Sequence, residues 1–231
     1  MAIYVQEYKL YLLIQSEHLD SYRHKGLRNK LIDDIRSKGI KNEEVLEAMG
    51  RVPRHLFMDS SFINFSYTDK AFPISAGQTI SQPYTVAYQT ELLDVSRHLK
   101  VLEVGTGSGY QTAVLLELGA RVYTIERQRQ LFLDAQKTLG PLNYKPIFFY
   151  GDGYEGLPAY APFDRILVTA AALEIPQSLL DQLTVGGVLV VPEGGPLGQK
   201  MIRVVRETED HFQHSEHGHF SFVPLLRGKN Y

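Results

Sequence analysis

The stretch "KVLEVGTGSGY" occupies residues 100–110 and decides the fold. A short apolar run, which is typical of a buried strand, leads directly into Gly105, Gly107 and Gly109. Glycine lets the backbone turn sharply off a strand and lets a ligand approach main-chain amides at the start of a helix. The stretch therefore predicts a nucleotide-binding loop between a strand and a helix.

The spacing around this loop differs from that of dinucleotide-binding dehydrogenases. The pattern G-x-G-x-x-G requires glycine at position 110 or 112, and Tyr110 and Thr112 stand there instead. An acidic residue that takes both ribose hydroxyls is expected about 20 positions after the first glycine. Glu126 ends the apolar run "VYTIE" at the right separation from Gly105. Together, the two features predict a site for a ribose-containing ligand.

Strand and helix patterns alternate on both sides of the loop. This alternation predicts an α/β fold with a doubly wound, mostly parallel, Rossmann-like sheet. Two further strand-like stretches, "KMIRVVRE" and "HFQHSEHGHFSFVPLL", follow without a long helix and predict an antiparallel hairpin at the sheet edge. The strands are expected at 100–104, 121–126, 146–150, 164–170 and 187–192, with helices near 109–118, 128–139 and 176–183.

Two helices are expected before the sheet. The first begins near Leu27 and is stopped by Gly39, and the second follows Asn42, a suitable N-cap, and runs to Met49. They predict a small helical N-terminal subdomain over residues 21–78. We expect this subdomain to form one compact catalytic unit with the nucleotide-binding domain, residues 79–231.

Residues 1–20 are expected to form an N-terminal extension. Their apolar stretch contains Glu7 and Lys9 and offers no small-residue cleavage site, so it makes a poor signal peptide. It is also too short to span a bilayer.

Charge and composition exclude several functions. The formal net charge of -2 argues against a polyanion-binding protein, and the chain has no cysteine for disulfides, thiolate metal sites or nucleophilic catalysis. Seven Lys or Arg residues between Arg23 and Lys41 form either a basic patch or a solvated helical face, and we favour the solvated face.

Four histidines lie close together near the C-terminal end. On a strand, His214 would point away from His211, His217 and His219, and His211 is too far from His217 to share one ion without a bend. We therefore expect no metal site.

A further acidic residue follows the third predicted strand. Asp152 lies between Gly151 and Gly153, at the carboxyl end of a strand, where open α/β sheets bind ligands. A carboxylate there can accept a hydrogen bond from an adenine amino group, although Asp-Gly alone is also a turn signal.

Taken together, these motifs resemble those of class I S-adenosylmethionine-dependent methyltransferases. The stretch "GQTISQPYTVAYQTELL", residues 77–93, resembles the segment before the first motif of protein-L-isoaspartate O-methyltransferases more specifically. The resemblance extends over "VLEVGTGSGYQTAVL", over residues 151–192 and over "FVPLLRG", and it covers about Tyr22 to Gly228.

The resemblance implies a function and a set of site residues. Members of this family use S-adenosylmethionine to methylate the α-carboxylate of L-isoaspartyl residues in damaged proteins and peptides, which begins repair through a succinimide. By this resemblance Ser81 is the catalytic residue. Ala172 departs from the pattern, since many bacterial members carry proline there. The resemblance and the motifs assign cofactor binding to Thr79, Ile80, Glu103, Gly105, Thr106, Gly107, Gly109, Glu126, Arg127, Gly151, Asp152 and Gly153, and substrate binding to Gln82, Pro83, Val168, Thr169, Ala170 and Ala171.

The chemistry suits these residues. A carboxylate nucleophile is already ionised at neutral pH, so the reaction needs no general base, and we expect no catalytic His or Cys. Pro83 fits the first turn of a helix, and amides there together with the Ser81 hydroxyl would hold the carboxylate. Alternatively, Ser81 only caps that helix. We assign Glu103 and Glu126 to binding, although Glu103 would also suit a role that only braces the glycine loop.

Two other functions remain open at this point. One is a class I methyltransferase that acts on another small molecule or on RNA, and the other is a binding module that grips peptides without turnover. For the favoured function we expect a cytoplasmic monomer that binds neither nucleic acid nor membranes.

Overall fold

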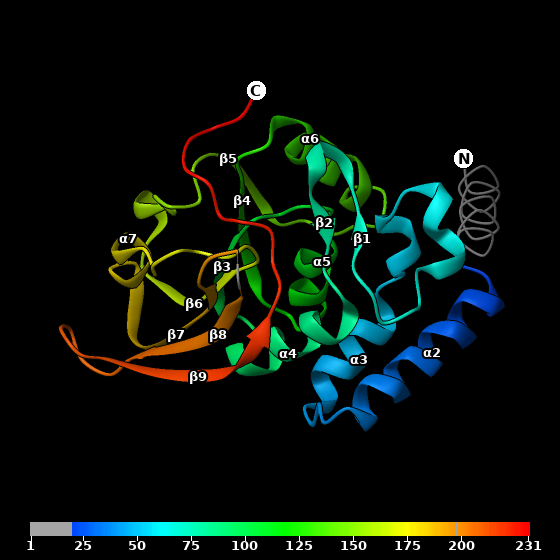
Figure 1. Ribbon diagram of the computed structural model, residues 1–231, viewed down its shortest axis with the longest axis horizontal. Coiled ribbons are helices and arrows are strands. Elements are labelled where there is room, and N and C mark those ends of the chain that lie inside the picture. The colour runs from blue at the N-terminus through cyan, green and yellow to red at the C-terminus, as the bar shows by residue number, and fades with distance from the viewer. Residues whose placement is uncertain (1–19, 197) are drawn as a thin grey trace, which may run out of the picture.

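The computed structural model describes residues 20–196 and 198–231. The extension expected over residues 1–20 therefore lies outside the described residues, apart from Asp20. Within the described part, a seven-stranded sheet forms the centre of the molecule, and helices pack around it (Figure 1).

The sheet has the strand order β5-β4-β3-β6-β7-β8-β9. The strands from β5 to β7 run parallel, and β8 and β9 continue the sheet as antiparallel strands. This confirms the predicted doubly wound, mostly parallel sheet with an antiparallel edge. The order reverses between β3 and β6, and ligands bind at such a reversal in open α/β sheets. The strands are β3 (Lys100–Val104), β4 (Arg121–Glu126), β5 (Ile147–Tyr150), β6 (Phe163–Val168), β7 (Leu183–Glu193), β8 (Gln199–Arg206) and β9 (Phe212–Phe220).

Both faces of the parallel part of the sheet are covered. Along β3, Val101 belongs to the core on one face, and Leu102 and Val104 belong to the core on the other. Such burial on both faces explains the nearly continuous apolar run of this strand. The first core includes residues of α4 (Pro83–Leu93), α5 (Tyr110–Glu117) and α6 (Arg129–Leu139), and the second includes residues of α7 (Gln177–Leu180).

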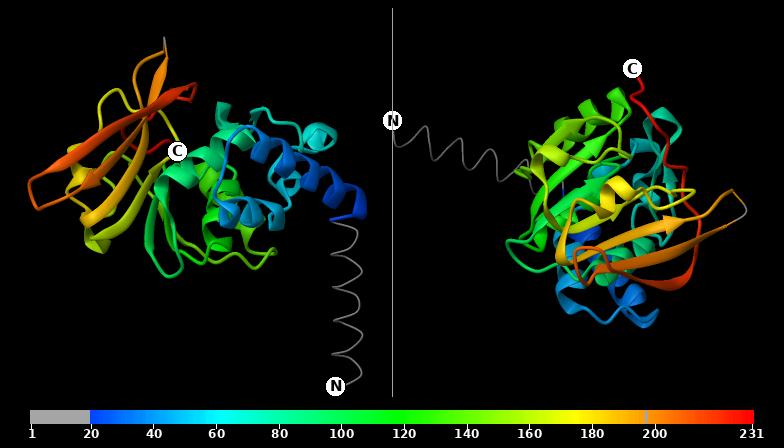
Figure 2. Two further views of the ribbon diagram at one scale, coloured as in Figure 1. Left: turned by 90° about the horizontal axis from the view of Figure 1, so that it is seen from below. Right: turned by 90° about the vertical axis from the view of Figure 1, so that its left-hand side faces the viewer.

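The N-terminal helices share the first of these cores. α2 (Tyr22–Ser37) and α3 (Glu43–Arg51) contribute Leu31 and Leu46 to the same apolar cluster that contains Val101 of the sheet. They lie on the opposite side of the molecule from the β8–β9 hairpin (Figure 2). The helical part and the sheet are thus joined by continuous apolar packing.

The observed elements differ from the predicted ones at several boundaries. α2 begins five residues before Leu27, because the Ser21 hydroxyl caps it by accepting from the His24 amide. The helix expected over 176–183 has only four residues, since Leu183 already pairs with Phe163 in the sheet. A small antiparallel sheet of β1 (Phe72–Pro73) and β2 (Thr79–Ile80) and four 3-10 turns were not predicted; the turns are η1 (Arg54–Phe57), η2 (Ser60–Phe65), η3 (Ser75–Gly77) and η4 (Pro158–Tyr160).

The basic residues between Arg23 and Lys41 are largely solvated, as expected. Arg28 is the exception, because its side chain is buried and bonds to Asp20, to the Gly50 carbonyl and to the Tyr67 hydroxyl. Among the helices that the structure describes, none is both long enough and apolar enough to cross a membrane.

Candidate active site

The glycine loop follows β3 at the point where the strand order reverses. Gly105 has a φ of +97°, and a Cβ atom there would lie 2.4 Å from Thr169 Oγ1. Gly109 has a φ of +86°, and a Cβ atom there would lie 2.9 Å from Leu139 of α6. Gly105 therefore allows close contact with the neighbouring strand end, whereas Gly109 allows close packing between the helices.

Glu126, at the end of β4, holds the glycine loop. Its Oε2 accepts from the Gly107 amide at 3.0 Å, and its Oε1 accepts from the Gln128 amide at 2.8 Å. Burial raises the pKa of this carboxyl group, while the hydrogen bonds from backbone amides oppose the rise. Two backbone amides thus fix the side chain of Glu126, the residue that the sequence spacing assigned to ribose binding.

Glu103 lies beneath the loop. Its side chain is completely buried, and its Oε2 accepts hydrogen bonds from the hydroxyls of Thr112 and Thr124. Burial raises the pKa of Glu103 to about 7, and its Oε1 has no hydrogen-bond partner among the described residues. Thr106 extends this buried network, because its hydroxyl lies 2.6 Å from that of Thr124.

The loop borders a cavity at the carboxyl ends of β3, β4 and β6, which we call the inner cavity. Gly153 belongs to its wall, and a Cβ atom there would lie 2.5 Å from Val104 Cγ1. Of the residues assigned to the cofactor from the sequence, six line this cavity: Thr79, Gly105, Gly107, Glu126, Arg127 and Gly153. Ile80 and Thr106 line a small adjoining pocket, whereas Glu103, Gly109, Gly151 and Asp152 line neither.

The C-terminal segment, residues 223–230, forms part of the inner cavity wall and is tied to the strand ends. Asp152 Oδ2 accepts from the Gly228 amide at 2.6 Å, and Asp152 Oδ1 accepts from the Tyr154 amide at 2.8 Å. Arg127 donates from Nε to the Gly228 carbonyl at 2.9 Å. Asp152 and Arg127 therefore hold the C-terminal segment against the strand ends. Figure 1 shows this segment in red, beyond the end of β9.

The residues that line the inner cavity have the chemistry that an adenosyl ligand requires, although the free volume between them is only about 70 Å³ in this structure. Gly105 and Gly153 line the cavity without side chains. A Cβ atom at either position would collide with a neighbouring residue. The Glu126 carboxylate supplies acceptors for ribose hydroxyls, and Ile125 and Leu225 supply apolar surface for a flat base. S-adenosylmethionine is thus compatible with the residues that line the cavity.

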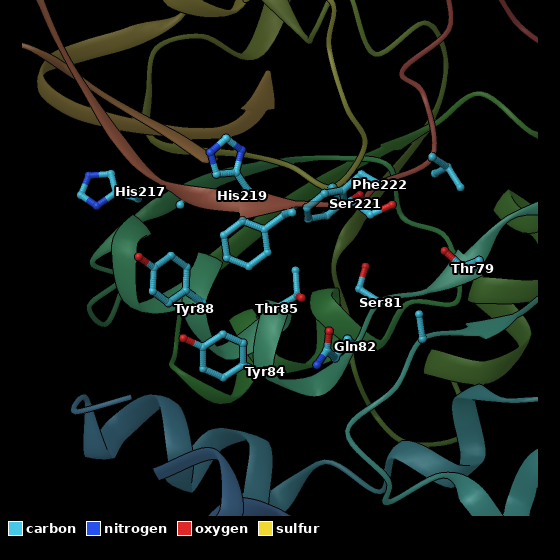
Figure 3. Close-up of a pocket in the computed structure, with 15 residues that line it drawn as sticks. Thr79, Ser81, Gln82, Tyr84, Thr85, Tyr88, His217, His219, Ser221 and Phe222 are labelled. Carbon is cyan, nitrogen blue, oxygen red and sulfur yellow. The ribbon is translucent and has the colours of Figure 1, made fainter. Parts of the chain in front are cut away.

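A second, wider cavity opens beside the first, and we call it the outer groove. It lies between α4 and β9 and has a volume of about 920 Å³. Figure 3 shows Ser81, Gln82 and Thr85 on one side of it and Ser221 and Phe222 on the other, with the Ser81 hydroxyl directed into the space. Thr79, Thr169 and Val223 line both cavities, so the two cavities meet beside Ser81.

The loop that carries Ser81 is held at the start of α4. Pro83 occupies the first turn of this helix, as predicted, and Gln82 is the N-cap residue without a side-chain capping bond. The side chain of Asp69 replaces such a bond, because its Oδ1 accepts from the Tyr84 amide at 2.8 Å. Ser81 therefore does not cap the helix, and one amide of its first turn, that of Tyr84, is already paired with Asp69.

A buried arginine supports the same loop from the other side. Arg54 is completely buried, and its Nη2 donates to the Ser81 carbonyl at 2.9 Å. Its guanidinium lies over the ring of Tyr110, 4.8 Å from the centroid. Burial lowers the pKa of Arg54 to about 10, so the side chain remains charged at neutral pH. Both supports, Arg54 and Asp69, come from the N-terminal part of the chain.

The residues assigned to substrate binding are only partly brought together. Gln82 and Thr169 line the outer groove, and Ala170 lines the inner cavity, but Pro83 and Val168 are buried and line neither. Ala171 is also absent from both walls, because its amide donates to the Val223 carbonyl and its carbonyl accepts from the Leu225 amide. The chain's own C-terminal segment thus pairs with the backbone that the resemblance assigned to substrate.

Ala172 extends this pairing. Its amide donates to the Pro192 carbonyl at 2.9 Å. Proline, which many bacterial family members carry at this position, has no amide hydrogen to make that bond.

Two of the four histidines near the C-terminal end face the same cavity. His217 and His219 both line the outer groove, as the alternation along a strand predicts for residues two apart. A group with metal-ligating atoms within 4.8 Å of one another lies elsewhere, and it consists of Asp20, His24 and His55. Asp20 in that group is already held in an ion pair at 2.8 Å by Arg28.

Several site residues were missed by sequence reasoning. Arg54 begins η1 and Asp69 lies in a loop; neither belongs to a recognisable motif, and only their position in the fold connects them to Ser81. Tyr88 of α4 and Phe220 of β9 lie far apart in the chain but line the same groove. The resemblance of "FVPLLRG" to the family pointed to the C-terminal segment, but it did not show where this segment lies in the fold.

Comparisons with known proteins agree with this arrangement. A solved protein-L-isoaspartate O-methyltransferase is similar in structure, with a TM-score of 0.77 and 26% identity, and the match covers 85% of this chain and 65% of that one. A curated protein-L-isoaspartate O-methyltransferase from Christiangramia forsetii is 57% identical, over 91% of this chain and 99% of its own length. Another from Cytophaga hutchinsonii is 58% identical, over 90% of this chain and 94% of its own length.

The family model for protein-L-isoaspartate(D-aspartate) O-methyltransferase matches residues 26–230. This match takes in the glycine loop, both cavities and the C-terminal segment that joins them. The chain therefore belongs to the protein-L-isoaspartate(D-aspartate) O-methyltransferase family.

Proposed function

We propose that this protein transfers a methyl group from S-adenosylmethionine to the α-carboxylate of L-isoaspartyl residues in damaged proteins and peptides. The observation that carries the proposal is the meeting of the inner cavity and the outer groove at Thr79, Thr169 and Val223. An adenosyl ligand in one cavity and a peptide in the other would approach each other beside Ser81. Membership of the family supports the same reaction.

In this proposal, the inner cavity holds the cofactor. Glu126 would accept from the ribose hydroxyls, and the backbone of Gly105 and Gly107 would pass close to the ligand. S-adenosylmethionine, when bound, supplies the electrophilic methyl group. Glu103, which is enclosed beneath the loop, would brace it through Thr112 and Thr124 rather than touch the ligand.

Ser81 would orient the substrate carboxylate. Its hydroxyl is a hydrogen-bond donor directed into the outer groove, and Arg54 fixes its backbone. A carboxylate is ionised at neutral pH, so the protein needs to supply position and exclusion of water rather than a proton acceptor. Holding reactants in alignment can lower a barrier by roughly 7–11 kcal/mol.

The test is transfer of labelled methyl from S-adenosylmethionine to a short isoaspartyl peptide and to its normal aspartyl twin. The proposal expects label on the isoaspartyl peptide alone, released by mild base as an ester is. Ser81→Ala should lower kcat/KM for this peptide by about 10- to 100-fold, because one oriented hydrogen bond to a charged group is lost.

Ser96→Ala is a matched control, because Ser96 is exposed and lies away from both cavities. It should retain full activity. Equal labelling of both peptides would contradict recognition of the isoaspartyl linkage. Labelling of neither peptide, with cofactor binding intact, would favour a methyltransferase for another small molecule or RNA, or a binding module without turnover.

We also propose that residues 21–78 and 79–231 act as one catalytic unit, since Arg54 and Asp69 of the first part hold the Ser81 loop of the second. We expect a cytoplasmic monomer that acts on isoaspartyl proteins without binding nucleic acid or membranes. The net charge of -2 and the lack of cysteine support this expectation. A concentration-independent monomer mass in light scattering would agree with it, and a dimer mass would contradict it.

A further inference from the structure

The outer groove is longer than a single reacting residue requires. Its volume of about 920 Å³ approaches the upper end of the ~300–1,000 Å³ range of small-molecule pockets. The groove meets the inner cavity only at its Ser81 end, and it continues from there between α4 and β9 toward His217 (Figure 3). A polypeptide whose reacting carboxylate lies beside Ser81 would therefore place flanking residues in the rest of the groove.

The wall beyond Ser81 is aromatic. Tyr84 and Tyr88, which are four residues apart and thus share a face of α4, have ring centroids 5.8 Å apart. Tyr88 also contacts Phe220 of β9, with ring centroids 5.3 Å apart, and Phe220 contacts Phe222 at 6.4 Å. We call these four residues the aromatic wall. All four are only partly buried, so their rings present surface to an occupant.

The described residues that line the groove offer a charged side chain no carboxylate, ammonium or guanidinium as counter-charge. Within residues 20–196 and 198–231, its lining contains no Asp, Glu, Lys or Arg, and its hydrogen-bonding side chains are hydroxyls, Gln82 and two histidines. A charged side chain placed there would lose water without gaining a counter-charge, which is unfavourable. An apolar or aromatic side chain would gain contact area and ring stacking instead.

We propose that the aromatic wall is a subsite for an apolar or aromatic side chain that flanks the isoaspartyl residue. The inference rests on the proposed function and deepens it. The protein then discriminates among damaged sites by their neighbours: sites beside Phe, Tyr or Leu are methylated in preference to sites beside Lys, Arg, Asp or Glu.

The test uses two sets of isoaspartyl peptides. The short set has one residue on each side of the isoaspartate, and the long set carries Phe, Ala, Lys or Glu in turn at each position up to three residues away. We expect Phe to lower KM at least fivefold relative to Ala at one or more positions of one flank, and Lys or Glu to raise it. The value of kcat should change by less than twofold, because the wall lies away from the reacting atoms.

Tyr88→Ala tests whether the aromatic wall causes the preference for Phe. It should reduce the preference for Phe over Ala to less than twofold on long peptides, and it should change kcat and KM of the short peptides less than those of the long ones. Tyr22→Ala is the matched control, because Tyr22 is an exposed tyrosine on α2, and it should alter neither set.

The experiment distinguishes a failure of this inference from a failure of the proposed function. If every isoaspartyl peptide stays unlabelled, the proposed function fails and this inference fails with it. If the long peptides are methylated with the same KM whatever their neighbours, the inference fails while the function stands. A Tyr88→Ala variant that loses activity equally on short and long peptides would also overturn it, because that result indicates a general structural role.

Discussion

The Nη2 atom of Arg54 lies 2.9 Å from the carbonyl oxygen of Ser81, so a fully buried guanidinium holds the backbone of the candidate catalytic loop. Two other nitrogens of this side chain, Nε and Nη1, have no hydrogen-bond partner among the described residues. Keeping a partly unpaired cation in the interior is costly. Its retention here is consistent with a role in positioning Ser81.

Arg54→Met should separate activity from stability. Methionine fills similar space without the charge. It leaves the Ser81 carbonyl unpaired, which costs about 1–3 kcal/mol, so the free energy of unfolding should change by no more than this amount. Because the Ser81 loop loses its anchor, we expect kcat to fall about 10-fold or more in the methyl-transfer assay. Arg23→Met, at an exposed site on α2, should change neither quantity. Retention of full activity by Arg54→Met would rule out the positioning role.

Glu126→Gln should weaken cofactor binding. The carboxylate accepts from two amides, those of Gly107 and Gln128, and a carboxamide can accept only with its one oxygen. The substitution also removes an acceptor from the ribose hydroxyls, which costs the complex about 1–3 kcal/mol, so the Kd for S-adenosylhomocysteine should rise about 10- to 100-fold. Isothermal titration calorimetry measures this Kd, with the exposed Glu174→Gln as control. Equal affinity in both variants would speak against ribose recognition by Glu126.

Two glycine-to-alanine changes should have different effects: one should abolish cofactor binding, and the other should stabilise the protein. Gly105→Ala places a Cβ atom 2.4 Å from Thr169 Oγ1 at a φ of +97°, so the loop must distort, and we expect loss of cofactor binding. Gly26→Ala lies in the interior of α2 with no heavy atom within 4 Å of the added Cβ. It should raise the free energy of unfolding by about 0.5–1 kcal/mol. Urea denaturation and calorimetry of both variants test the pair, and normal binding by Gly105→Ala would contradict the account of the loop.

Glu103 should make stability depend on pH. Its pKa of about 7 in the folded protein exceeds the unfolded value of 4.5, so the folded state binds more protons between these values. The free energy of unfolding should therefore fall as the pH rises from about 4.5 to 7, by up to about 3 kcal/mol from this group alone. Glu103→Gln removes this contribution, and urea denaturation at pH 5 and pH 8 compares the two proteins. A difference between them that is the same at both pH values would refute the assignment.

The fold was largely predictable because its signals are local. The apolar run and glycines of residues 100–110 define a strand and a turn, and the distance to Glu126 follows from the length of one helix and one strand. Boundaries were less predictable where contacts from distant segments decide them. α7 is short because Leu183 is drawn into pairing with Phe163, which no local pattern reveals.

The candidate site was predictable only in part, for a similar reason. Residues proposed to bind through their backbone and their position at a strand end, such as Gly105, appear in motifs. Residues that act across the fold do not: Asp69 caps α4 from a loop, and Phe220 reaches the outer groove from the last strand. Arg28 resembled the other surface cations in the sequence, because its partners Asp20 and Tyr67 come from separate segments.

The C-terminal segment also has a consequence for the order in which the protein is made. Residues 223–230 leave the ribosome after every strand of the sheet, yet they supply part of the inner cavity wall and pair with Ala171 and Asp152. Chains emerge N-terminal end first, and early segments begin to fold during synthesis. A chain interrupted before Val223 would thus carry its glycine loop and Ser81 but lack the surface that completes the cavity, so translation must pass this segment before the enzyme can be active.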